Sequence, residues 1–491
     1  MAGKVYLIGA GPGDPKLLTV KGLECLKQAD VLIYDRLANP MYLKEVRPTC
    51  ELIYVGKASS DHTLSQADIN ELILQKARDG KQVVRLKGGD PYVFGRGGEE
   101  GEMLARHDVA FEVVPGISSA IGGLAYAGIP ITHRDHASSF HVVTAHLKDD
   151  TGPDWDVLAK LEGTLVFLMG AQRSKLISQA LIQAGKSKTT PVAFITHATT
   201  PKQQVTVTTL DDMAGIEVKP PTLIVVGTVV TLRDTLNFFE QKPLFGKSIV
   251  VTRASKQNRT LIEKITDRGG QVIEAPTIEV IPVADQRELE QEMKQLGNYQ
   301  YVIFTSMNTV DIFFQNLDEW GYDARALAGV KVVAIGKQTA AGLKEKGVKA
   351  DFIPTLATQE GLVELLNPLL TSTDRILLPK AKKTRPLLTD QLKAHVTEVI
   401  LYELRLDISG KEQLINCLTE QTVDYMTFSS ARTVEHLIET VGVGKRHLLK
   451  PVKLVSIGPI TTKALEQAGL TVYKEAKEPL IDAMIEVLEE N

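Results

Sequence analysis

At 491 residues the chain is too long for a single hydrophobic core, and its length alone predicts about three domains. With 43% apolar and 24% charged residues it has the composition of an ordinary globular protein, and a net charge of −4 offers no basic surface for nucleic acid or an anionic membrane. Three dispersed cysteines favour neither a disulfide framework nor a thiolate metal site, and without a signal-peptide pattern or an apolar run of roughly 18 residues we expect a cytoplasmic protein.

The first predicted element is a strand that begins at Val5 and ends in glycines, within the stretch VYLIGAGPGDPKLLT (5–19). An apolar run that breaks into glycines is typical of a buried parallel strand followed by a ligand-binding turn. The dinucleotide fingerprint, however, needs a third glycine where Asp14 stands, and an aspartate there would repel a pyrophosphate. This turn therefore argues against an NAD-dependent oxidoreductase, the main alternative for the first half of the chain.

Further apolar runs alternate with helical patterns through the first half, at residues 31–35, 82–87, 164–169 and 222–227. This alternation predicts an α/β architecture with largely parallel sheets. A helical pattern then ends near Pro243 and Gly246, and a new strand follows at once. We place the main boundary there, with domains over 1–243 and 244–491.

Three turns of the first half each follow a predicted strand: GAGPGDP (9–15), GGDP (88–91) and PGISSA (115–120). The paired glycines let the backbone approach a ligand closely, and Asp90 can accept hydrogen bonds from hydroxyl groups. The GxxxxGK[ST] motif of phosphate-binding P-loops does not occur. The turns therefore suit a nucleoside that carries no phosphates.

The second half contains an internal duplication. VIFTSMNTVDIFF (302–314) and YMTFSSARTVEHLI (425–438) share a frame, as do residues 331–348 and 453–470. The order and the nearly constant spacing of these matches predict two similar α/β lobes. In both lobes, serine and threonine lie at strand ends just before helices. They are either simple helix N-caps or, together with free backbone N–H groups, part of a site for a ligand with several carboxylates.

At this point the motifs resemble two known families. GAGPGDPxLLT, YDRL (34–37), YVGK (54–57), RLKGGDPxxFGRGGEE (85–100) and YAGIPITHRD (126–135) resemble the uroporphyrinogen-III C-methyltransferases of the tetrapyrrole methylase family, over residues 3–235. The repeated segments of the second half look like uroporphyrinogen-III synthase, from about residue 244 onward. The resemblance implies two two-lobed α/β halves and a bifunctional enzyme of tetrapyrrole biosynthesis.

For the first half, the resemblance implies S-adenosylmethionine as methyl donor and two methylations of uroporphyrinogen III. It implies Asp35 as the base and Lys57 as the proton donor. Asp35 could instead pair with Arg36 or contact a ribose, and Lys57 could instead hold a substrate carboxylate. Arg85, Arg96 and Arg134 are candidates for substrate carboxylates or for structural ion pairs. The cofactor positions carried over are Pro12, Gly88, Gly89, Asp90, Val93, Ser118, Ser119, Met169 and Ala198. Ala198 departs from the glycine of many relatives and is strained if its φ is positive.

For the second half, the resemblance implies closure of hydroxymethylbilane to uroporphyrinogen III with inversion of ring D. Tyr402 is the candidate general acid, or else a structural tyrosine between the lobes. Thr309 departs from the glycine that relatives often carry in TSxNG. The predicted substrate-binding residues are Arg253, Thr305, Ser306, Thr339, Ser429, Ser430 and Thr461.

Two further expectations concern ligands and partners. His133 and His136 are three residues apart, but no third ligand has a credible spacing, so we predict no metal. The resemblance implies tetrapyrrole substrates and a homodimer formed through the first half. A non-catalytic tetrapyrrole-binding or sensing role for the synthase-like half is the alternative that stays open.

Overall fold

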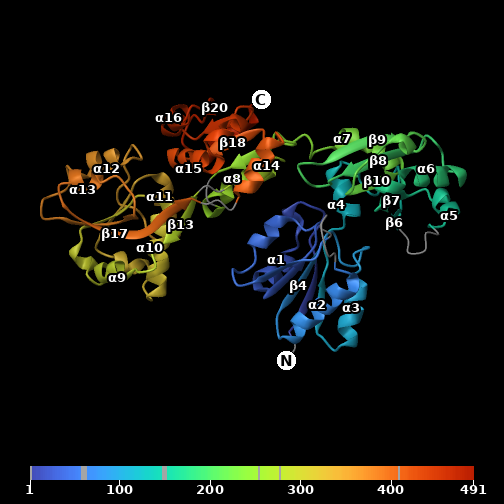
Figure 1. Cartoon of the computed structure of the whole chain (residues 1–491), viewed down its shortest axis with the longest axis horizontal. Coiled ribbons are helices and arrows are strands. Elements are labelled where there is room, and N and C mark those ends of the chain that lie inside the picture. Colours follow the sequence, from blue (N-terminus) through green and yellow to red (C-terminus); the bar gives the residue numbers. More distant parts are fainter. Residues whose placement is uncertain are drawn as a thin grey trace. The chain divides into compact units, whose positions relative to one another are not determined.

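The computed structural model describes residues 3–56, 64–145, 152–252, 255–275, 278–406 and 410–490. The chain divides into two compact units, Met1–Ser248 with Glu263–Val272, and Ile249–Ile262 with Ile273–Asn491. In the described residues each unit contains two five-stranded sheets with helices packed on them (Figure 1). The predicted α/β class is therefore confirmed.

The first lobe of the first unit is an entirely parallel sheet in the order β3-β2-β4-β1-β5. Its strands are β1 (Val5–Gly9), β2 (Val31–Tyr34), β3 (Glu51–Tyr54), β4 (Val83–Lys87) and β5 (Phe111–Val114). Its helices are α1 (Val20–Gln28), α2 (Gln66–Arg78), α3 (Gly97–Arg106) and α4 (Ser119–Tyr126). Because β4, β1 and β5 are neighbours, the three turns predicted from the sequence follow adjacent strands at one sheet edge.

The second lobe of the first unit has the order β6-β7-β10-β8-β9. Its elements are β6 (Phe140–Thr144), α5 (Trp155–Lys160), β7 (Thr164–Leu168), α6 (Ser174–Gln183), β8 (Pro191–Thr196), β9 (Gln204–Thr209), β10 (Thr222–Val226) and α7 (Arg233–Leu236). Among the neighbouring strand pairs of the described residues here, β6–β7 is parallel, whereas β10 is antiparallel to β7 and to β8, and β8 is antiparallel to β9. The expectation of largely parallel sheets is therefore wrong for this lobe, where a short connection reverses the chain between β8 and β9.

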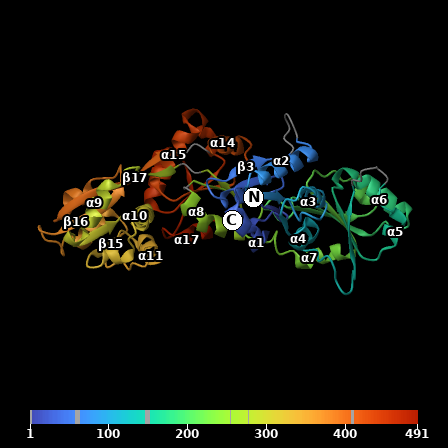
Figure 2. The same cartoon turned by 90° about the horizontal axis from the view of Figure 1, so that it is seen from below.

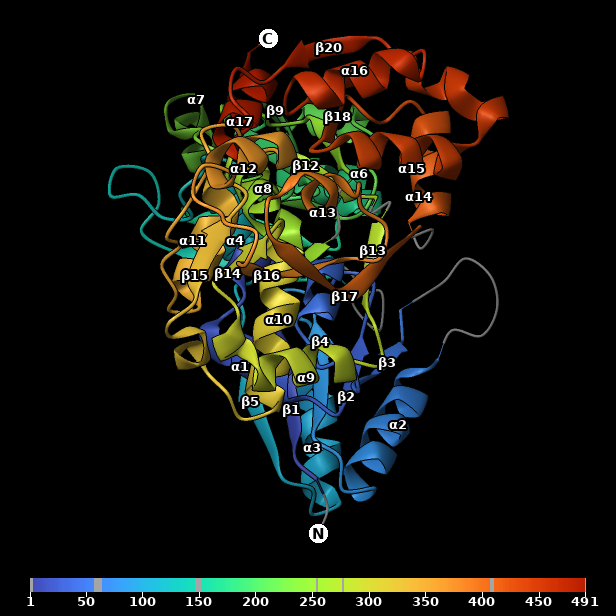
Figure 3. The same cartoon turned by 90° about the vertical axis from the view of Figure 1, so that its left-hand side faces the viewer.

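The second unit has the sheets β12-β11-β18-β19-β20 and β13-β17-β16-β14-β15. The first lobe is built from β11 (Ser248–Val251), α8 (Ser255–Asp267), β12 (Gln271–Glu274), α14 (Lys411–Thr419), β18 (Tyr425–Phe428), α15 (Ala431–Val441), β19 (Lys453–Ser456), α16 (Pro459–Gln467), β20 (Val472–Glu475) and α17 (Ile481–Glu489). The second lobe is built from β13 (Ile278–Pro282), α9 (Arg287–Lys294), β14 (Tyr301–Phe304), α10 (Met307–Glu319), β15 (Lys331–Ala334), α11 (Lys337–Glu345), α12 (Gln359–Leu366), β16 (Arg375–Ala381), α13 (Leu387–Gln391) and the long strand β17 (His395–Leu406). Figure 3 shows β17 running beside β16.

The duplicated segments occupy equivalent places in these two lobes. The segment at 302–314 forms β14 and α10, and its counterpart at 425–438 forms β18 and α15. Each of these strands pairs in parallel with the strand of the second repeated segment, β14 with β15 and β18 with β19. In the same way α10 packs against α11 (Figure 2) and α15 packs against α16 (Figure 1). The two lobes therefore share their central topology.

Buried aliphatic and aromatic side chains cover both faces of each sheet, which accounts for the continuous apolar runs in the sequence. Strands β4, β7 and β10 are buried at every position. Within the described ranges, no helix combines the length and the apolar character that crossing a bilayer requires.

Candidate functional site

The three glycine turns of the first lobe pack backbone against backbone. The Gly11 N–H donates to the Gly89 carbonyl at 3.1 Å, and the Gly89 N–H donates to the Gly11 carbonyl at 2.8 Å. A Cβ added to Gly9 would lie 2.5 Å from the Gly116 Cα, and a Cβ on Gly116 would lie 2.4 Å from the Gly89 oxygen. Any larger residue at these positions would force the turns apart, so the glycines create one contiguous surface of main-chain groups.

Asp90 ties the second turn to the third. One carboxylate oxygen accepts from the Tyr92 N–H at 2.8 Å, and the other accepts from the Gly116 N–H at 3.0 Å. Each oxygen keeps a further lone pair for an outside donor. Gly89, with φ +69°, would direct a Cβ into open space, with Ser118 and Ser119 as its nearest neighbours at 3.9 Å. The second and third turns thus leave room between them.

The other cofactor positions predicted around these turns have mixed surroundings. Ser118 N-caps α4 and accepts from the Ala120 N–H at 3.3 Å, and Ser119 is the first residue of that helix. Gly88 is packed against Leu37, because a Cβ there would lie 2.6 Å from the Leu37 Cβ. Two more predicted cofactor positions belong to this lobe. Pro12 is half-buried and lies in the first turn, and Val93 is exposed and follows the second turn.

Asp14 holds the first turn against other parts of the same unit. Its carboxylate accepts from the Lys16 N–H and from the Tyr126 hydroxyl, both at 2.8 Å, and its own N–H donates to the Thr199 hydroxyl at 3.0 Å. Burial, followed by this contact with Asp14, raises the pKa of Tyr126. The aspartate that argued against a pyrophosphate site is therefore satisfied within the protein.

The turn at residues 197–200 of the second lobe closes on the first turn. A Cβ on Gly13 would lie 2.8 Å from the Thr200 Cγ2 and 3.0 Å from the Ala198 oxygen. His197 and Thr199 have positive φ values of +48° and +65°, whereas Ala198 is not among the described residues with positive φ. The glycine-to-alanine departure at Ala198 is thus compatible with its backbone. Met169, 56% exposed and with φ +55°, follows β7.

Asp35 lies directly after β2 and is engaged from two sides. One oxygen accepts from the Leu37 N–H at 3.1 Å, and the other lies 3.5 Å from the Arg85 Nη2 on the neighbouring strand β4. Its ion-pair partner is therefore Arg85, not the adjacent Arg36 considered from the sequence. Lys57, the predicted proton donor, lies outside the described residues.

A buried ion cluster that sequence reasoning missed extends from Arg85. Lys87 and Arg85 approach the same oxygen of Glu100, at 2.7 Å and 3.4 Å, and Gln66 donates to it at 3.2 Å. Glu100 is 0% exposed, and its other oxygen has no hydrogen-bond partner among the described residues. Burial, and then the charge of Arg85, lowers the pKa of Lys87. The sequence signal for this cluster is a pair of cationic residues, Arg85 and Lys87, at alternate positions of an otherwise apolar strand.

The remaining predicted arginines lie apart from this cluster. Arg96 pairs with Glu99 on the first turn of α3, with its Nε 2.9 Å from the Glu99 Oε1. Arg134 is exposed. His133 and His136 meet edge to face with ring centroids 5.0 Å apart, and among the described residues no group of three His, Cys, Asp or Glu side chains could hold a metal ion.

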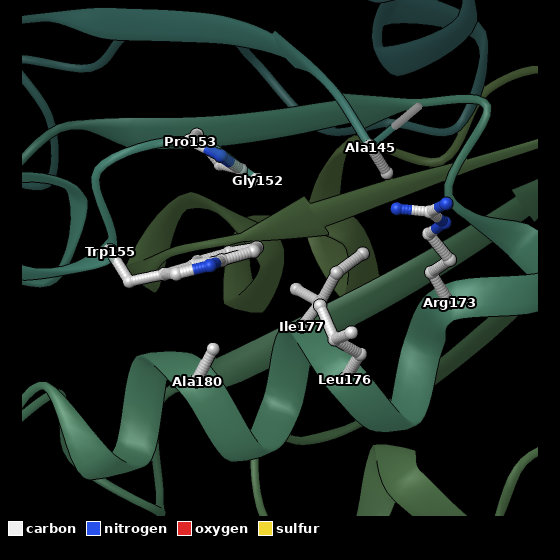
Figure 4. Close-up of a pocket in the computed structure, with 8 residues that line it drawn as sticks. All are labelled: Ala145, Gly152, Pro153, Trp155, Arg173, Leu176, Ile177 and Ala180. Atoms are coloured by element: carbon white, nitrogen blue, oxygen red, sulfur yellow. The ribbon is translucent and has the colours of Figure 1, made fainter. Parts of the chain in front are cut away.

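A separate cavity of about 130 Å³ lies in the second lobe of the first unit (Figure 4). The Trp155 ring faces Ala180 and Ile177 of α6, and Arg173 lies at the end near Ala145. Of the predicted site residues that the structure describes, none lines this cavity, so it is distinct from the glycine turns.

In the second unit, Tyr402 on β17 meets the turn after β14. Its hydroxyl lies 3.0 Å from the Ser306 Oγ, which lies 2.8 Å from the Thr309 Oγ1. Ser306 also N-caps α10 by accepting from the Thr309 N–H at 3.2 Å. The half-buried Thr305 precedes it. The tyrosine, the capping serine and Thr309 thus form one hydroxyl cluster.

The equivalent turn after β18 has Ser429 and Ser430, both half-buried. Ser430 N-caps α15, so the capping interpretation applies to Ser306 and Ser430 alike. Thr339 and Thr461 lie in the first turns of α11 and α16 and are buried. Arg253 lies outside the described residues. The roles of all these residues as substrate ligands stay predictions.

The comparisons with known proteins match both halves of the chain. The family model for tetrapyrrole (corrin/porphyrin) methylases matches residues 4–214, and the model for uroporphyrinogen-III synthase HemD matches residues 259–486. The porphyrin biosynthesis protein HemD of Ruminiclostridium josui is 38% identical over 99% of this chain and 97% of its own length. The chain belongs to the family that joins a tetrapyrrole methylase to a uroporphyrinogen-III synthase. The resemblance drawn from the motifs is therefore confirmed.

Other relatives cover parts of the chain. The uroporphyrinogen-III C-methyltransferase of Bacillus subtilis is 42% identical over 70% of this chain and 72% of its own length. A solved structure of the uroporphyrin-III C-methyltransferase of Thermus thermophilus, in complex with S-adenosylhomocysteine, is 44% identical, with a TM-score of 0.42 over 47% of this chain and all of that one.

Proposed function

We propose that this chain is a bifunctional enzyme of tetrapyrrole biosynthesis. The first half transfers two methyl groups from S-adenosylmethionine to uroporphyrinogen III and gives precorrin-2. The second half closes hydroxymethylbilane to uroporphyrinogen III with inversion of ring D. Membership in the two-part family supports both activities, and the product of the second half is the substrate of the first.

The observation that carries the methyltransferase assignment is the glycine-lined surface of the three turns beside Asp35. The turns present main-chain groups and the free lone pairs of Asp90, and the Asp14 carboxylate is already satisfied by Tyr126 and Lys16. These hydrogen-bonding groups suit a nucleoside that has hydroxyl groups and no phosphate. S-adenosylmethionine fits it and supplies an electrophilic methyl group.

Asp35 acts as the base of the methyltransferase. When a pyrrole carbon of the substrate forms its new bond to the methyl group, the carbon–sulfur bond breaks and the macrocycle must lose a proton. Asp35, at the end of β2 and held by Arg85 and the Leu37 N–H, presents a partly exposed carboxylate for that proton. Lys57 serves as the proton donor.

The synthase half steers the conformation of a linear substrate. The helix N-termini of α10, α11, α15 and α16 follow strand ends, where backbone N–H groups and short hydroxyls bind carboxylates. Tyr402 protonates the departing hydroxyl of hydroxymethylbilane, which leaves as water when the ring closes. The enzyme works in the cytoplasm as a homodimer through its first half, and its product feeds the sirohaem or cobalamin route.

Each half has its own test. S-adenosylhomocysteine, and not NAD, is expected to raise the melting temperature, and added uroporphyrinogen III is expected to be methylated. Hydroxymethylbilane is expected to be closed enzymatically without any methyl donor. Methylation without closure would identify the second half as a tetrapyrrole-binding or sensing module, and stabilisation by NAD alone would contradict the methyltransferase assignment.

A further inference from the structure

The hydroxyl cluster of the second unit forms a chain of three groups with a direction. The Ser306 Oγ lies 3.0 Å from the Tyr402 hydroxyl, 2.8 Å from the Thr309 Oγ1, and 3.2 Å from the Thr309 N–H, which donates to it. A serine hydroxyl offers one proton and two lone pairs. The backbone N–H takes one lone pair, so Ser306 accepts from one of the two neighbouring hydroxyls and donates to the other.

The two possible directions leave different protons without a partner. If Ser306 donates to Thr309, the threonine proton is left unbonded inside the protein, where Thr309 is 0% exposed. If Ser306 donates to Tyr402, the phenolic proton is the unbonded one, on a side chain that is buried but keeps 4% exposure. In the described part of the chain, neither hydroxyl has a second hydrogen-bond partner. An unmade hydrogen bond in the interior costs more than one that a ligand or water can complete.

We propose that Thr309 is a positioning residue that makes Tyr402 a proton donor toward the substrate. Thr309 donates to Ser306, Ser306 donates to the Tyr402 oxygen, and the phenolic proton has no partner among the described residues. A phenol that accepts a hydrogen bond releases its own proton more readily, because hydrogen bonds in a chain polarise one another. The inference rests on the proposed ring closure, in which the phenolic proton passes to the departing hydroxyl and water is released.

The duplicated lobe supplies a natural comparison. Thr433 occupies the place of Thr309 in the repeated frame, and its hydroxyl donates to the Ser430 carbonyl at 2.6 Å. Ser430 accepts from the Thr433 N–H as a cap, as Ser306 does from Thr309. The capping geometry is therefore shared, whereas the link from threonine hydroxyl to serine hydroxyl to tyrosine occurs in the lobe that carries Tyr402. The Thr309 hydroxyl is therefore placed to act on Tyr402 through Ser306, whereas the Thr433 hydroxyl is bonded to the main chain.

The test uses the full chain and follows closure of hydroxymethylbilane in Thr309→Val, Thr309→Ser, Tyr402→Phe and the double variant Thr309→Val/Tyr402→Phe. Valine keeps the shape of threonine and removes the hydroxyl. We expect Thr309→Val to lower kcat about three- to tenfold with little change in KM, the effect of one ordinary hydrogen bond. Thr309→Ser restores most of the rate. Thr433→Val is the matched control and leaves kcat near the wild-type value.

The double variant distinguishes a role of Thr309 in positioning Tyr402 from a role in packing alone. If Thr309 acts through Tyr402, adding Thr309→Val to Tyr402→Phe lowers the rate by less than about twofold, because the two residues act as one unit. Independent losses that multiply, or a Thr309→Val enzyme as fast as wild type, would overturn the inference. A Tyr402→Phe enzyme at full rate would overturn it as well. Absence of closure by the wild-type chain would instead refute the proposed function, and a cooperative denaturant transition of the second half, the one that S-adenosylhomocysteine does not shift, reports that each variant is folded there.

Discussion

The two halves of the molecule build their candidate sites from different chemistry. In the first unit, ionised side chains lie beside glycine turns, and Asp35 is linked through Arg85 to the buried Glu100 and Lys87. In the second unit, neutral hydroxyls gather at strand ends and helix N-termini. A reaction that must remove a proton from carbon needs a carboxylate that its neighbours fix in place. A reaction that guides a flexible chain into a ring needs many weak contacts with that chain. The first half should therefore be more sensitive to single substitutions.

The largest expected effect is that of Asp35→Asn. The amide keeps the size of the side chain and cannot take a proton, so methyl transfer to uroporphyrinogen III should fall by at least about a hundredfold. Ring closure by the second half should keep its rate, and an unchanged rise in melting temperature with S-adenosylhomocysteine shows that the first half is folded. Loss of both activities would contradict the separation of the two halves, and full methyl transfer would remove Asp35 as the base.

The next effect is on stability and comes from Lys87→Met. Removal of this cation leaves the fully buried Glu100 with a weaker set of donors, and breaking a buried ion pair costs about 3–5 kcal/mol. Denaturant unfolding of the first half should report the loss, with that transition identified by its shift on addition of S-adenosylhomocysteine.

The control for Lys87 is Lys76→Met in the same lobe. Lys76 pairs with Glu51 at 2.7 Å on the surface, where such pairs contribute about 0–1 kcal/mol. Equal losses in the free energy of unfolding would show that the ion pairs around Glu100 stabilise the fold no more than the Lys76–Glu51 pair does.

A smaller effect separates the two capping serines of the second half. Ser306→Ala and Ser430→Ala each remove an N-cap, and each should cost about 1 kcal/mol of stability. Only Ser306 bonds to Tyr402, so Ser306→Ala should lower the kcat of ring closure, whereas Ser430→Ala should act on KM through a substrate carboxylate. Steady-state kinetics measures the split, and the same pattern in both variants would contradict it.

The smallest expected effect is that of Tyr126→Phe. Loss of the hydroxyl leaves Asp14 with the Lys16 N–H and removes one of the contacts that hold the first turn. We expect the affinity for S-adenosylhomocysteine to fall by about three- to tenfold, because only part of the roughly 1.5–3 kcal/mol of a hydrogen bond to a charged group is transmitted to the cofactor site. Calorimetric titration measures it, and an unchanged affinity would show that the turn keeps its shape without Tyr126.

Local patterns in the sequence predicted much of the fold and the position of the turns. The glycine motifs follow neighbouring strands, and the repeated frame around Ser306 and Ser430 forms equivalent turns in two lobes. What could not be predicted depends on partners far apart in the chain. Asp14 meets Tyr126 and Thr199 only after folding, and the mixed sheet of the second lobe depends on how its strands pair. The contact of Ser306 with both Thr309 and Tyr402 likewise became visible only in the folded structure.

The most direct measurement of the central claim is a single reaction in which the purified chain receives freshly made hydroxymethylbilane under anaerobic conditions, with and without S-adenosylmethionine. Product mass and absorbance are followed over time. We expect uroporphyrinogen III without the methyl donor and, with it, a product two methyl groups heavier. Closure without methylation would contradict the assignment of the first half, and methylation of added uroporphyrinogen III without closure would contradict that of the second.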